Sequence, residues 1–311
     1  MTDEGSLAGS TAAGVVLAIG GERIVIRTPA PRPVVYEELR RWFGWFVAAG
    51  RPDVTLFLEL DADRVMARGA EAGASMLPPA VEYARGCYAW QWPGGISAGY
   101  DMARGEGRFS APVFPPHAFR FFLLLVCVLR LLERDGLIVH AGALTSHGAA
   151  LLLLGTSGAG KTTLIRDAAP CDPLADDLAI LRRADGLWWV YRSPWMSGGT
   201  GNRWSMDGAV RRPLEAGFVL DRRVEEFCDS FPPLPAAQAL MRCLAWMPAG
   251  GSSAGGLAAL TAMVSRLSVD APWYRLSYVR SQGSPWRLLR RTDERVEHAS
   301  NEEAVETHAQ C

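Results

Sequence analysis

Lysine is almost absent from this sequence: 31 of its 32 basic residues are arginine, and the single lysine is Lys161. Arginine replaces lysine at little cost on most surfaces, but not where a compact ammonium must reach a phosphate as a point charge. Lys161 lies in such a place, because residues 155–162 read Gly-Thr-Ser-Gly-Ala-Gly-Lys-Thr. This is the G-x-x-x-x-G-K-[ST] pattern of a phosphate-binding loop.

The sequence also lacks a strong net charge, closely spaced cysteine pairs, a long apolar run and a basic N-terminal region. The formal net charge is −1, which favours neither a nucleic acid nor an anionic membrane as partner. Six scattered cysteines form no C-x-x-C pair, which predicts reduced thiols and no structural zinc site. The apolar run 119–132 is shorter than the about 20 residues of a membrane span, and the acidic start lacks the basic region of a secretion signal. We therefore expect a cytoplasmic protein.

The first part of the chain has the pattern of a small α+β domain. Residues 15–28 alternate in hydropathy around Gly20-Gly21, which predicts a hairpin. Residues 35–49 have apolar residues at helical spacing, and strands are expected at 54–60 and within 85–100. Prolines at 112, 115 and 116 mark a boundary. We predict an N-terminal domain over 1–112, for acceptor recognition or oligomerisation, and a catalytic domain over 113–311.

The second part alternates strands and helices around the glycine-rich segment. A buried helix is expected at 117–134 and strands at 137–141 and 149–154, the second apolar on both faces as in a central strand. A short helix, 161–168, ends before Pro170. Further strands are expected at 178–182, 187–191, 217–220 and 274–280, a loop at 250–256, and a frayed polar tail from about 292. The order of strand, loop and helix predicts an α/β fold.

The loop predicts a nucleoside triphosphate site. Its backbone N–H groups and the dipole of the following helix can hold phosphate oxygens. The Lys161 ammonium would reach the β- and γ-phosphates, and the Thr162 hydroxyl would bind Mg²⁺. The predicted nucleotide-binding residues are Gly155, Thr156, Ser157, Gly158, Ala159, Gly160, Lys161, Thr162 and Thr163.

Two adjacent carboxylates, Asp176 and Asp177, follow 15 and 16 residues beyond Lys161. A short helix and a returning strand would bring them back beside the loop. One could hold Mg²⁺, and the other could accept a proton from an attacking hydroxyl. The sequence alone does not decide which carboxylate binds the metal and which accepts the proton. The alternative is an Asp-Asp turn with no catalytic role. His140, at the end of a predicted strand, is either a structural residue or part of the same site.

Three elements have the spacing of one known family: His140, the glycine-rich loop and Leu174-Ala175-Asp176-Asp177. The sequence therefore resembles the HPr kinase/phosphorylase family and its related kinases. That family has a histidine 15 residues before the first loop glycine, the loop G-x-S-G-x-G-K-[ST] and a strand L-x-A-D-D. The resemblance covers roughly residues 115–290. It implies a P-loop catalytic domain with the phosphoenolpyruvate carboxykinase-like fold, preceded here by the small α+β domain.

The resemblance also implies roles. His140 and Lys161 fall on active-site positions, Asp177 or else Asp176 is the proton acceptor, and Thr162 and Asp176 hold the metal. HPr kinases proper carry a metal-binding glutamate in a later segment, but residues 191–199 contain none. This argues against HPr as substrate and leaves a second metal contact and the reverse phosphorylase reaction open. Arg192 is either a phosphate clamp or a surface cation. Trp195 and Trp204 are either an acceptor wall or hydrophobic packing.

The function predicted from these features is a kinase that uses ATP and Mg²⁺. The acceptor would be a hydroxyl on a precursor peptide, a protein or a small molecule. An ATPase or nucleotide-dependent switch without an acceptor is the alternative, and a degenerate nucleotide-binding partner is a third reading. Because HPr kinases are hexameric, we also expect a homo-oligomer.

Overall fold

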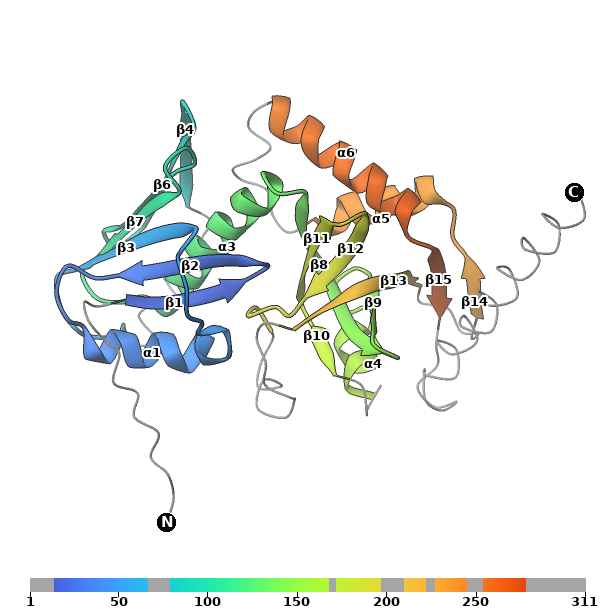
Figure 1. The fold of residues 1–311 in the computed structure, drawn as a ribbon, viewed down its shortest axis with the longest axis horizontal. Coiled ribbons are helices and arrows are strands. Elements are labelled where there is room, and N and C mark those ends of the chain that lie inside the picture. Colours follow the sequence, from blue (N-terminus) through green and yellow to red (C-terminus); the bar gives the residue numbers. More distant parts are fainter. Residues whose placement is uncertain are drawn as a thin grey trace, which may run out of the picture.

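The computed structural model describes residues 14–66, 79–167, 172–196, 210–221, 227–244 and 254–277. They form a mixed α/β fold with two β-sheets, one built from residues 14–111 and the other from residues 136–277. The two sheets lie next to each other along the long axis of the molecule (Figure 1).

The first sheet has seven strands in the order β1-β2-β3-β7-β6-β5-β4. Strands β2, β3 and β7 run parallel to one another, and the other neighbours are antiparallel. Because the helix α1 (Pro33–Phe43) lies between β2 and β3 in sequence, these two strands can be parallel. The strands are β1 (Gly14–Ile19), β2 (Glu22–Arg27), β3 (Val54–Leu60), β4 (Ala80–Ala84), β5 (Cys87–Trp92), β6 (Ile96–Asp101) and β7 (Glu106–Ala111).

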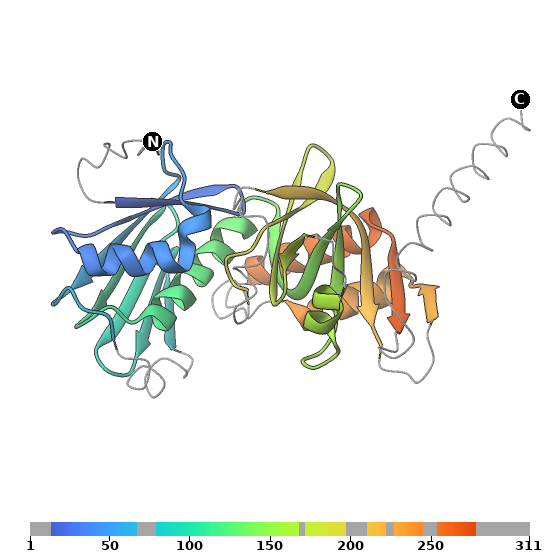
Figure 2. The same cartoon turned by 90° about the horizontal axis from the view of Figure 1, so that it is seen from below.

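Two helices cover one face of this sheet (Figure 2). They are α1 (Pro33–Phe43), extended by the 3₁₀ turn η1 (Gly44–Phe46), and α3 (Pro116–Leu132). The Arg120 guanidinium lies 4.2 Å from the Trp42 ring centre, so the two helices are in contact. The buried side chains of α3 belong to the same hydrophobic core as those of the first sheet. The core of the first sheet therefore continues past the predicted boundary at residue 112, and the division into domains stays a prediction.

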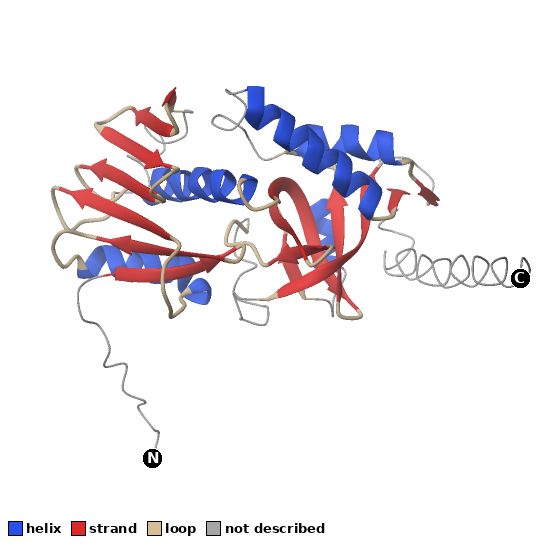
Figure 3. Cartoon of the chain, turned by 45° about the horizontal axis from the view of Figure 1, so that its top comes forward, coloured by secondary structure: helices blue, strands red, loops and turns tan. Residues whose placement is uncertain are grey.

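The second sheet has eight strands, five of which close a ring. The pairings run β8-β11-β12-β13-β9 and back to β8, because β8 pairs with β11 through its first half and with β9 through its second half. The strands of the second sheet, red in Figure 3, are β8 (Gly136–Ser146), β9 (Ala149–Leu154), β10 (Pro173–Ala175), β11 (Leu178–Ala184), β12 (Leu187–Tyr191), β13 (Arg211–Leu220), β14 (Phe227–Ser230) and β15 (Trp273–Ser277).

Helices pack on both sides of the second sheet. The short helix α4 (Lys161–Asp167) shares a core with β9, β13 and β15. On the other side, α5 (Pro233–Cys243) and α6 (Ala254–Asp270) share a larger core with β8, β9, β11 and β12. Strand β9 is thus central and buried, as its apolar sequence predicts.

Most predicted elements are present, with shifted ends. The sequence did not predict α5 and α6, and residues 254–256 of the expected loop begin α6. The expected helix over 35–49 instead ends at Phe43, and β8 and β13 are longer than expected. The expected C-terminal tail lies outside the described residues. Within the described ranges, no helix is long and apolar enough to span a membrane.

Candidate functional site

The glycine-rich loop connects β9 to α4 and begins at the C-terminal end of β9. Gly158 and Gly160 have φ values of +75° and +101°, a backbone region that residues with a Cβ rarely adopt. These two glycines therefore let the chain turn tightly between Leu154, at the end of β9, and Lys161, the first residue of α4.

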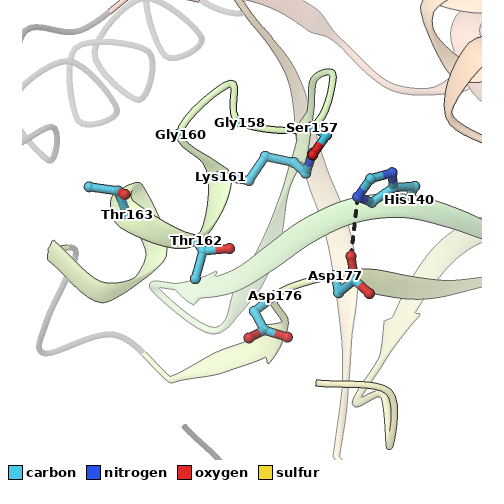
Figure 4. A pocket seen from close by; sticks show the side chains of 9 residues that line it. All are labelled: His140, Ser157, Gly158, Gly160, Lys161, Thr162, Thr163, Asp176 and Asp177. Atoms are coloured by element: carbon cyan, nitrogen blue, oxygen red, sulfur yellow. Dashed lines mark ion pairs between the residues drawn. The ribbon is translucent and has the colours of Figure 1, made fainter. Parts of the chain in front are cut away.

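A cavity of about 230 Å³ lies against this loop (Figure 4). The structure brings most of the predicted site residues to it, although they come from three separate segments of the chain. Its lining consists of His140, Ser157, Gly158, Gly160, Lys161, Thr162, Thr163, Asp176 and Asp177.

Lys161 is buried, and its side chain folds back onto its own loop. Its Nζ donates hydrogen bonds to the carbonyl oxygens of Gly155, at 2.6 Å, and Thr156, at 3.2 Å. Burial lowers the pKa of Lys161 below its ordinary value, while Cys243 and Asp177 act in the opposite direction. The charge of the ammonium is thus only partly compensated by the residues around it.

Strand pairing explains why His140 and Asp177 meet. Leu178, the first residue of β11, lies opposite His140 in β8, so Asp177 ends up next to the imidazole. His140 Nε2 lies 3.1 Å from Asp177 Oδ1 (Figure 4), and both side chains remain about half exposed, at 40% and 48%. The pair is therefore open to a molecule that enters the cavity.

Asp176 differs from its neighbour in burial. Its exposed fraction is only 2%, yet it lines the same cavity as the Thr162 hydroxyl. Hydroxyl and carboxylate oxygens are the protein ligands that Mg²⁺ accepts, and Mg²⁺ usually takes one or two of them together with phosphate oxygens and water. Within the described part of the chain, no three His, Cys, Asp or Glu residues form a metal site. The donors thus fit Mg²⁺ held together with a phosphate, but not a metal held by the protein alone.

Arg192 does not line this cavity. Its guanidinium is buried and forms an ion pair with Asp172, just before β10. Trp195 belongs to the core of the first sheet, and its Nε1 donates to the Arg120 carbonyl oxygen at 3.4 Å. Trp204 lies outside the described residues. The structure therefore does not bring Arg192 or Trp195 to the cavity.

Two residues near the loop were not predicted. Cys243, the last residue of α5, is close enough to Lys161 to influence its pKa. Asp221 follows β13, which runs parallel to β9 with Val219 opposite Leu154, so it comes next to the start of the loop. Neither residue stands in a recognisable motif, and only the pairing of distant segments could reveal them.

Comparison with known proteins adds little to this geometry. No protein family model matches the chain, and no curated protein matches it. Among solved structures, the HPr(Ser) kinase/phosphatase from Coxiella burnetii matches over 54% of this chain and 97% of its own. The two are 13% identical in sequence, with a TM-score of 0.33.

Proposed function

We propose that this protein is a kinase that transfers the γ-phosphoryl group of ATP to a hydroxyl group. One observation carries the proposal: a single cavity brings together a lysine on a glycine-rich loop, the threonine after it, a buried carboxylate, and a half-exposed aspartate paired with a histidine. Phosphoryl transfer needs these functions side by side: phosphate binding, metal binding and acceptance of a proton.

The phosphate groups would bind at the loop. Backbone N–H groups of a glycine-rich turn form a concave site for anions, and the strand, loop and helix order of 149–167 supports a P-loop domain of the HPr-kinase-like kind. Lys161 would exchange its contacts with the two loop carbonyls for contacts with the outer phosphates. In the transition state its charge would stabilise the negative charge that develops on the transferred group.

Thr162 and Asp176 would hold Mg²⁺. When bound, Mg²⁺ would neutralise negative charge on the β- and γ-phosphate oxygens. The position of Asp176 in the lining of the cavity, despite its burial, supports this assignment, because carboxylate oxygens are ligands that Mg²⁺ prefers. The same burial argues against Asp176 as the base, since an acceptor hydroxyl must come within hydrogen-bonding distance of the base.

Asp177 is the better base. Its carboxylate would accept the proton of the acceptor hydroxyl while the hydroxyl oxygen attacks the γ-phosphorus and the bond to the bridging oxygen breaks. ADP leaves, and a phosphate ester forms. The adjacent His140 would orient the carboxylate through the contact between Nε2 and Oδ1. The acceptor class we propose is a serine of a peptide or protein, or a small-molecule alcohol.

The test is incubation with γ-labelled ATP, Mg²⁺ and the products of neighbouring genes as acceptors. Label on one of these products, absent when Lys161→Ala replaces the wild-type protein, supports the kinase. Release of labelled phosphate with no labelled acceptor would indicate an ATPase instead. A wild-type protein that does not bind an ATP analogue in the presence of Mg²⁺ would contradict both functions.

A further inference from the structure

The turn of the first hairpin reaches into the second sheet. A Cβ added at Gly20, between β1 and β2, would lie 3.0 Å from Ile180 Cγ2 and 3.3 Å from Leu131 Cδ2. One added at Gly21 would lie 2.7 Å from Arg182 Nη1. The turn therefore packs closely against β11 and the end of α3.

The residue after this turn, Glu22, carries a carboxylate that is almost completely buried, with 2% exposed. Three arginines surround it. Arg130 Nη2, on α3, lies 3.3 Å from Oε2, and Arg182 Nη1, on β11, lies 3.5 Å from Oε1. Arg134 Nε, just beyond α3, lies 3.7 Å from Oε1. Strand β2 of the first sheet is thus tied to β11 of the second through a single acidic group.

A buried ion cluster of this kind contributes little net stability. The cost of removing the charges from water offsets much of their attraction, and well-packed apolar residues would often be as stable. What such a cluster does provide is geometry, since the Glu22 carboxylate left without its arginines would be an uncompensated buried charge. Glu22 therefore fixes the position of Arg182, and with it β11, relative to the first sheet.

Strand β11 is the strand that positions the candidate base. It begins one residue after Asp177, and its first residue, Leu178, lies opposite His140. Ile180 and Arg182, which contact the hairpin, lie two and four residues further along the same strand. A displacement of β11 at the hairpin would consequently move Asp177 relative to His140.

We propose that Glu22 is a positioning residue for the candidate active site: through Arg182 and the hairpin turn, the first sheet holds β11 so that Asp177 stays in contact with His140. This inference rests on the proposed function for its effect on turnover, although the structural coupling does not. It gives the N-terminal sheet a second task besides recognition of an acceptor or oligomerisation.

The experiment uses Glu22→Gln in the full-length protein, with folding checked by near-ultraviolet circular dichroism at the working temperature. The Cε1–H resonance of His140 is observed in protein labelled at histidine and assigned with His140→Gln. We expect this resonance to shift in Glu22→Gln and to stay unchanged in the control Glu59→Gln, which removes an exposed carboxylate of the same sheet. Arg182→Gln leaves Glu22 paired with Arg130 and Arg134 and should reproduce the shift. This variant replaces Glu22→Gln in the test if Glu22→Gln does not fold.

Turnover provides the second readout, measured as label transferred from γ-labelled ATP to the acceptor that the wild-type protein labels, together with affinity for a fluorescent ATP analogue. We expect a loss of about tenfold in kcat with an analogue Kd within about twofold of wild type, and partial recovery in Glu22→Asp. An unchanged His140 resonance with wild-type turnover in folded Glu22→Gln and Arg182→Gln would overturn the inference. If the wild-type protein transfers no label to any acceptor, the proposed function fails, while the resonance still decides on the coupling.

Discussion

His140 Nε2 lies 3.1 Å from Asp177 Oδ1, across the pairing of β8 with β11. Two residues separated by more than 30 positions thus form one polar pair beside the only lysine of the chain.

Removal of the histidine should slow phosphoryl transfer without abolishing nucleotide binding. His140→Gln loses the contact that orients the Asp177 carboxylate, so we expect kcat to fall by about 10²-fold, at the lower end of what acid–base groups contribute. Binding of a fluorescent ATP analogue should change little, because the loop and Lys161 remain. Equal turnover by His140→Gln and wild type would assign the histidine a structural role only.

Asp176→Asn should weaken the response to Mg²⁺. The amide keeps the size of the side chain but removes the charge that favours a hard divalent cation. We expect the Mg²⁺ concentration for half-maximal binding of an ATP analogue to rise by about tenfold or more, measured by fluorescence. The matched control is Asp229→Asn on β14, whose carboxylate is 62% exposed and lies near Arg275. If both variants respond to Mg²⁺ as wild type does, Asp176 is not a metal ligand.

Lys161 should make nucleotide binding sensitive to alkaline pH. Burial lowers its pKa below the ordinary lysine value, so the ammonium is lost at a lower pH than in the unfolded chain. Affinity for an ATP analogue should therefore decline as pH rises through the lowered pKa of Lys161. The stability of the free protein should respond in the opposite sense. Between the lowered pKa of Lys161 in the folded protein and its ordinary pKa in the unfolded chain, the unfolded state binds more protons, and stability therefore rises with pH.

Titration of analogue binding and of urea unfolding between neutral and alkaline pH checks both trends. Lys161→Gln should bind weakly and should lack both pH dependences that this group contributes. Identical alkaline trends in wild type and Lys161→Gln would mean that another group is responsible.

The strand next to the loop should tolerate no side chain at Gly217. A Cβ there would lie 2.2 Å from Trp273 Cζ3, and Trp273 is a buried ring of the neighbouring β15. We expect Gly217→Ala to lower the free energy of unfolding by about 1–3 kcal/mol, as overpacking does. Gly99→Ala on β6 is the control, since its Cβ would find its nearest contact at 3.5 Å. Urea denaturation of the two variants should separate them, and equal stability would contradict the packing described for β13 and β15.

The sequence predicted local structure well wherever one pattern dominated. The apolar run of β9 and the glycines before Lys161 specify a buried strand and a tight turn by themselves. Helices α5 and α6 were missed because Pro233, Pro235 and the glycines at 255 and 256 are weak helix formers, and packing on the second sheet overrides that preference. Helix propensity along the sequence therefore could not predict these two helices.

The site was predictable in its residues but not in its arrangement. Asp176 and Asp177 look equivalent in the sequence, and only the fold buries the first and leaves the second half exposed. Arg192 looked available as a phosphate ligand, whereas its partner in the structure is Asp172. The coupling of Glu22 to β11 joins residues 160 positions apart, a distance that no sequence pattern spans.

The most direct measurement is transfer of label from γ-labelled ATP to an acceptor by wild type and Asp177→Asn, with analogue binding measured in parallel. We predict that the variant binds the analogue as wild type does, because the loop and Lys161 are intact, while transfer falls by at least about 10²-fold for loss of the base. Transfer at the wild-type rate by a folded Asp177→Asn protein would contradict this prediction.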